Sequence, residues 1–168
     1  TQYGTTLHAG QTQGVAALPG LLDLAGNPAA PAIIRATAAT LAEPHVHPGT
    51  VPAARALLQD ADPSVRIAGL GMIAPIDPLN RVLSAAPLLS DPVRGVRVEA
   101  ARVLADVPDA QIPEGRRAAR VAALQEYVAS LQLEADWPSG NVNLGNLRLR
   151  QGRMDEAVAA FERAIALD

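Results

Sequence analysis

The chain has 168 residues, of which 49% are hydrophobic and 18% charged, so it can bury a core and is not a disordered charged tail. Its 34 alanines and only four aromatic residues favour helices and argue against a β-sandwich or barrel. All 14 cations are arginine, interspersed with 17 acidic residues, and the net charge of −3 argues against a nucleic-acid partner.

Several motifs are missing from the sequence, and their absence excludes some classes of functional site. The chain has no cysteine, which excludes a disulfide, a thiolate metal site and a covalently attached c-type haem within it. It also has no nucleophile elbow and no phosphate-binding glycine loop, so we expect no enzymatic activity. No run approaches the roughly 20 apolar residues of a membrane helix, so we expect no membrane insertion.

Residues 1–13 show no clear pattern and fit either a short helix or the tail of a preceding domain. Residues 14–105 then contain three segments that superpose at a spacing of 31 residues. Arg35, Arg66 and Arg97 are equivalent, and in each segment apolar or small residues recur at i, i+4 and i+7. This spacing places them on one face of a helix.

Each of these segments is preceded by a second apolar stretch, at 15–25, 51–58 and 79–89. Prolines at the segment starts suit the first turn of a helix, where the missing N–H costs nothing. The sequence therefore predicts a helix, a short turn and a second helix, repeated three times. One such pair cannot bury its apolar face alone, but stacked pairs can.

The runs Asp-Pro-Ser-Val-Arg at 62–66 and Asp-Pro-Val-Arg-Gly-Val-Arg at 91–97 resemble short HEAT-type repeats, including the bilin-lyase-like variety. In that family an Asp six residues before the Arg often forms a side-chain ladder between repeats. Asp60 with Arg66 and Asp91 with Arg97 match this spacing, whereas Ala29 stands at the equivalent position of the first segment.

A second period, of 34 residues, links residues 116–135 to the segment ending at 168. The run Asn-Leu-Gly-Asn at 143–146, then Gly152, Ala157 and Phe161, closely resembles a tetratricopeptide (TPR) repeat. In such a repeat Gly145 and Ala157 let two helices cross closely, Phe161 fills the gap and Gly152 permits a tight turn.

The predicted fold is therefore an all-α, right-handed α-solenoid of antiparallel helix pairs, HEAT-like and then TPR. The TPR region covers residues 116–168, with one complete repeat at 138–168 after a half repeat. Residues 106–115 form a Pro-rich linker. Because the sequence starts with Thr and stops within the TPR pattern, we expect it to be a piece of a longer protein that exposes solenoid ends able to self-associate.

Two groups of residues and one further histidine are candidates for binding. In TPR proteins the first helix of a repeat lines a concave groove, and this resemblance implies peptide-binding roles for Asn143, Asn146 and Arg150. His45 and His47 follow Glu43 and offer two imidazoles to one metal ion, with solvated loop histidines as the alternative. His8 is a candidate ligand for a haem held elsewhere, or a polar residue on a short helix.

We interpret the chain as a protein–protein interaction or scaffold module that binds a protein or peptide partner, needs no cofactor and has no catalytic activity. The order of Leu-His-Ala-Gly, HEAT-like units and TPR also resembles the C-terminal part of bacterial multihaem c-type cytochromes. That alternative implies haem upstream of residue 1, electron transfer and a periplasmic location, whereas a plain scaffold would be cytoplasmic. A bilin-lyase-like role is a further alternative.

Overall fold

The structure is a computed structural model that describes residues 2–167. These residues form ten α-helices, joined by turns and short 3₁₀ helices, and no strand occurs among them. The α-helices are α1 (Gln2–Thr12), α2 (Leu18–Ala25), α3 (Ala32–Ala42), α4 (Val51–Leu57), α5 (Pro63–Ile73), α6 (Pro78–Ala85), α7 (Arg94–Val103), α8 (Glu114–Leu133), α9 (Pro138–Arg150) and α10 (Met154–Ala166). The all-α class predicted from composition is confirmed.

The helix starts follow from local sequence. Asp62 precedes α5, and its carboxylate accepts a hydrogen bond from the backbone N–H of Ser64 at 2.8 Å. Asp77 caps α6 in the same way, through the N–H of Asn80 at 3.0 Å. A proline follows each of these acids, in the first turn where its missing N–H costs nothing. The sequence signal thus locates the start of α5 correctly, whereas α7 begins only at Arg94, two residues after Pro92, with Val93 as an N-cap that makes no side-chain hydrogen bond.

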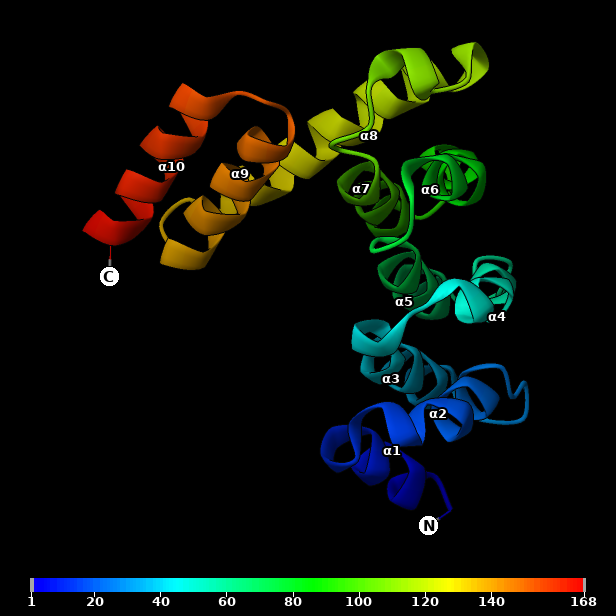
Figure 1. Ribbon diagram of the computed structural model, residues 1–168. Coiled ribbons are helices and arrows are strands. Elements are labelled where there is room, and N and C mark those ends of the chain that lie inside the picture. The colour runs from blue at the N-terminus through cyan, green and yellow to red at the C-terminus, as the bar shows by residue number, and fades with distance from the viewer. Residues whose placement is uncertain (1, 168) are drawn as a thin grey trace.

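The first seven helices form a column in which neighbours along the chain stack on one another (Figure 1). Helix α3 packs on α2 and α5, α5 packs on α7, and α7 packs on α8. We call α1–α7 the N-terminal column. At its upper end in Figure 1, α8 leads across to α9 and α10, which we call the C-terminal hairpin and which lie beside the column.

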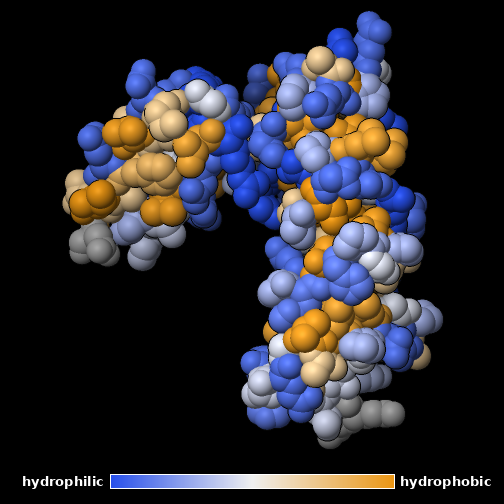
Figure 2. Space-filling model, in the orientation of Figure 1, coloured by the Kyte–Doolittle hydropathy of each residue, from blue (hydrophilic) through white to orange (hydrophobic). Residues whose placement is uncertain are grey.

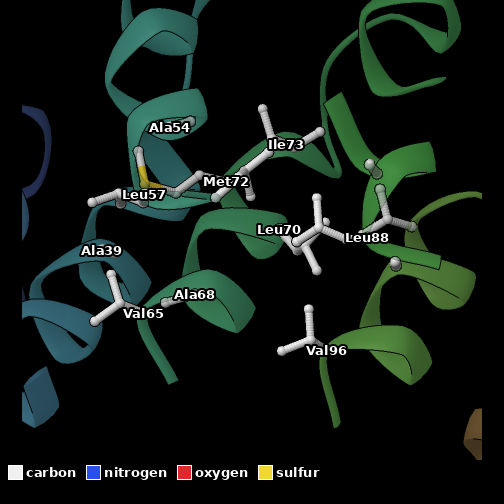
Figure 3. Close-up of a cluster of buried hydrophobic side chains, with 14 of the residues drawn as sticks. Ala39, Ala54, Leu57, Val65, Ala68, Leu70, Met72, Ile73, Leu88 and Val96 are labelled. Atoms are coloured by element: carbon white, nitrogen blue, oxygen red, sulfur yellow. The ribbon is translucent and has the colours of Figure 1, made fainter. Parts of the chain in front are cut away.

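One continuous apolar core runs through the column. Figure 3 shows its centre, where Leu70 of α5 lies beside Leu88 and Val96 from the next segments. Leu70 and Val96 are fully buried, and Met72 of the same helix points the other way, toward Leu57. Because α5 buries side chains against both the preceding and the following segment, apolar contacts connect these two segments through α5.

Arginine–carboxylate pairs join successive segments of the column. Arg35 binds Asp60, Arg66 binds Asp91 at 2.9 and 3.0 Å, and Arg97 binds Glu126 at 2.6 and 3.0 Å, each through two guanidinium nitrogens. Because two nitrogens hold each carboxylate, such a pair fixes the relative orientation of the two side chains and also neutralises their charges. Each link therefore joins one segment to the next along the chain.

Side-chain pairs do join successive segments, as the HEAT-type resemblance implies, but the carboxylates of Asp60 and Asp91 do not bind the Arg six residues later. Arg66 does contact Asp60, but its Nη1 donates to the backbone carbonyl of Asp60, at 2.8 Å. Arg97 donates in the same way to the backbone carbonyl of Asp91. The carboxylates of Asp60 and Asp91 instead accept from the arginine of the preceding segment. The carboxylate and the backbone carbonyl of one Asp therefore accept from two different arginines.

The segments at either end of the column are more ordered than the sequence indicates. Residues 2–12 form α1, which packs on α2 and α3, while Thr1 lies outside the described residues. Within the predicted linker 106–115, Val107 and Ile112 are buried in the column core. This stretch is therefore packed structure, and α8 begins at Glu114, two residues before the predicted start of the TPR region.

The C-terminal hairpin owes its close packing to one glycine. A Cβ on Gly145 would lie 2.5 to 2.8 Å from the ring of Phe161, so only glycine lets α9 and α10 approach this closely. Gly152, with φ of 73°, makes the turn between them. Both roles agree with the interpretation of these residues from sequence. A small cluster of Ala105, Leu131 and Leu147 joins the hairpin to α8 and the column.

Candidate functional site

A cavity of about 290 Å³ lies where the end of α7 meets α8 and α9. We call it the junction cavity. Its polar lining is supplied by three helices: Arg102 from α7, Tyr127 from α8, and Asn143, Asn146 and Arg150 from α9. Ala105, Leu147 and Leu149 complete the wall. The cavity therefore exists only where the N-terminal column and the C-terminal hairpin come together.

The spacing of α9 explains how its polar residues share this wall. Asn143, Asn146 and Arg150 stand at i, i+3 and i+7, one side of a helix. Leu147 and Gly145 are buried against the neighbouring helices, so the three polar side chains remain exposed at the opening. Amide side chains in this position can both donate and accept hydrogen bonds.

The charge of Arg102 is already neutralised by Glu99, one turn earlier on α7, through two hydrogen bonds of 2.8 and 2.6 Å. Tyr127 is half-buried, and burial raises the pKa of its hydroxyl above the ordinary value. The hydroxyl therefore remains protonated at neutral pH and is available as a hydrogen-bond donor. The nearby positive charge of Arg102 only partly offsets this effect on the Tyr127 pKa.

A second cavity of about 580 Å³ adjoins the first, and Ala105 and Arg150 line both. The acids on its wall are also paired. Arg81 holds Asp106 through two bonds of 2.7 Å, and these lower the pKa of the Asp106 carboxyl. Arg120 binds Asp109 and donates to the backbone carbonyls of Leu104 and Val107. The local chain at 104–109 is thus fixed by buried guanidinium groups.

The structure brings three of the six candidate residues together. Asn143, Asn146 and Arg150, chosen from the TPR resemblance, line one cavity. The histidines lie elsewhere: His8 is exposed on α1, and His47 accepts a hydrogen bond at Nδ1 from the N–H of Gly49.

His45 lies near Gly14, with Cε1 at 3.8 Å from the position that a Cβ there would take. Glu43, proposed as their carboxylate neighbour, reaches instead over Gly71 of α5. Across residues 2–167 no three His, Cys, Asp or Glu side chains are grouped as a metal site would require. The haem and metal roles remain predictions.

Sequence reasoning missed Arg102 and Tyr127, which stand 25 residues apart and belong to different helices. No local pattern marks them as neighbours, although Tyr127 is one of only four aromatic residues. Only the packing of α7 against α8 brings them to one wall.

A different exposed surface lies on the C-terminal hairpin. Apolar side chains are exposed there: Met154, Val158 and Ile165 on α10, and Val142 on α9. Figure 2 shows hydrophobic patches on this limb. Such a surface agrees with the expectation of self-association, which stays a prediction.

No protein-family model, no curated protein sequence and no solved structure shows a significant match to this chain. None of the helices described is both long and apolar enough to cross a lipid bilayer.

Proposed function

We propose that the chain is a protein–protein interaction module without catalytic activity of its own, built as a right-handed α-solenoid of HEAT-like units followed by TPR. Its binding surface is the junction cavity, which takes an extended peptide segment of a partner protein. The stacking of α3, α5 and α7 and the close crossing of α9 and α10 support this architecture.

The observation that carries the proposal is the convergence of Asn143, Asn146 and Arg150 on one cavity with Arg102 and Tyr127. An extended peptide presents unpaired backbone N–H and C=O groups along its length. Amide side chains match both groups, because each can donate and accept. The residues predicted from the TPR resemblance therefore lie where a peptide backbone could be held.

The test is capture of a partner from host extract with the 168-residue chain as bait, followed by measurement of its affinity. The double variant Asn143→Ala/Asn146→Ala removes both amides, and we expect about thirtyfold weaker binding, since each net hydrogen bond contributes roughly 1 kcal/mol. The matched control is Gln59→Ala/Gln111→Ala, which removes two exposed amides outside the cavity.

The control should bind like the unaltered chain. A partner retained equally by both double variants would show that the junction cavity is not the binding surface. Retention of no partner at micromolar bait would contradict the function itself.

A further inference from the structure

Arg150 differs from the other arginines of the chain. Thirteen of the 14 donate at least one hydrogen bond within residues 2–167, most of them to a carboxylate or a backbone carbonyl. Arg150 has no hydrogen bond and no ion pair among those described residues. Its guanidinium is exposed at the boundary between the two adjoining cavities.

The other charged residues that line these cavities each have an ion-pair partner. Arg102 pairs with Glu99 and Arg120 with Asp109, while Arg153 shares Glu156 with Arg148. Asp106 pairs with Arg81 outside the cavities, and the charge of Arg150 adds a further attraction to that carboxylate. Arg150 is the one arginine lining the two cavities that has no ion pair among residues 2–167.

The surface around Arg150 also shows where a ligand would lie. Figure 2 shows strongly hydrophilic side chains gathered where the limb of α9 and α10 meets the column. On one side of Arg150 stand the amides of Asn143 and Asn146 and the protonated hydroxyl of Tyr127. On the other side the second cavity continues to the turn at Gly152. Because Arg150 lines both cavities, a group bound to its guanidinium lies at the edge of each of them.

We propose that the junction cavity is selective for acidic peptides, with a carboxylate of the partner segment paired to Arg150 and its backbone held by Asn143 and Asn146. This inference rests on the proposed function and names the chemistry of the partner. A carboxylate at this place supplies the missing counter-charge without breaking any existing pair. A basic segment would instead leave Arg150 facing a like charge.

The experiment selects binders from a displayed library of random dodecapeptides, with the whole 168-residue chain as target. The selected peptides are then synthesised and their affinities measured against three proteins: the unaltered chain, Arg150→Gln and Arg117→Gln. Arg117 is another exposed arginine and lies outside both cavities, so its substitution is a control for the loss of one charge.

We expect the selected peptides to be enriched in Asp or Glu and to bind Arg150→Gln about two- to fivefold more weakly, with little change for Arg117→Gln. Replacing the acidic residue of the peptide by Gln or Asn should have the same effect on the unaltered chain and no added effect on Arg150→Gln. Raising the salt concentration should weaken binding to the unaltered chain more than binding to Arg150→Gln.

Two results would overturn the inference in distinguishable ways. Peptides without acidic residues that still depend on Asn143 and Asn146 would refute the acidic preference and leave the interaction module standing. Peptides that depend on neither Asn143, Asn146 nor Arg150 would refute both the preference and the peptide-binding cavity.

Discussion

The N-terminal column and the C-terminal hairpin are both built from short helices, but different contacts hold them. In the column, successive segments are joined by Arg–carboxylate pairs such as Arg66–Asp91 and by a continuous apolar core. The hairpin depends on the close crossing of Gly145 and Phe161 and joins α8 through a small cluster. This difference indicates that the column unfolds as one unit and that the hairpin can open separately.

The largest expected effect comes from the core of the column. Leu70→Ala removes a fully buried side chain that contacts two neighbouring segments, so we expect a loss of about 3 kcal/mol in the free energy of unfolding. Leu147→Ala, in the small cluster, should instead raise hydrogen exchange in α9 and α10 and leave the column protected. Denaturant unfolding with hydrogen exchange separates the two. Equal loss of protection everywhere in both variants would show that the chain is one cooperative unit.

Removing an ion pair should lower the free energy of unfolding more in the column than in the hairpin. Arg66→Ala leaves the carboxylate of Asp91, whose side chain is only 9% exposed, without its partner, so we expect a loss of about 2 kcal/mol. The control, Arg153→Ala, removes a half-exposed partner of Glu156 at the start of α10 and should cost less than about 0.5 kcal/mol. Urea unfolding measures both. Similar losses in the two variants would contradict a special role for the links in the column.

The smallest expected effect is the loss of stability when the pH is lowered. Hydrogen bonds from Arg35 lower the pKa of Asp60, and Arg97 does the same for Glu126. A carboxyl whose pKa is lower in the folded than in the unfolded state stabilises the fold above the unfolded pKa, near 4, and this is lost as the pH falls through the folded pKa. Between pH 5 and pH 3 we therefore expect hydrogen-exchange protection to fall more in α3, α5 and α7 than in the hairpin. A larger fall in the hairpin would count against these pairs.

Most of the helices could be predicted from the sequence, because their signals are local. The 31-residue spacing of Arg35, Arg66 and Arg97 locates α3, α5 and α7, and Asp62 marks where α5 begins. The route of the side-chain ladder could not be predicted in this way. Whether Arg66 reaches Asp60 or Asp91 depends on which segment packs beside it, and the spacing along the chain is compatible with both.

The candidate site was predictable only in part. The spacing of Asn143, Asn146 and Arg150 on one helix face is visible in the sequence and explains why all three line one wall. Arg102 and Tyr127 belong to other helices, and their side of the cavity depends on the angle at which α8 leaves the column. No residue pattern specifies that angle.

By itself the sequence determined the helical class, the repeated pairs and the tight turn at Gly152, since periodicity, capping and glycine conformation act within a few residues. Tertiary packing decided which arginine meets which carboxylate, and which arginine has neither a hydrogen bond nor an ion pair among the described residues. Ion pairs form between groups that packing brings within about 4 Å, whatever their separation in the chain. For that reason the unpaired charge of Arg150 emerges only from the folded arrangement of α7, α8 and α9.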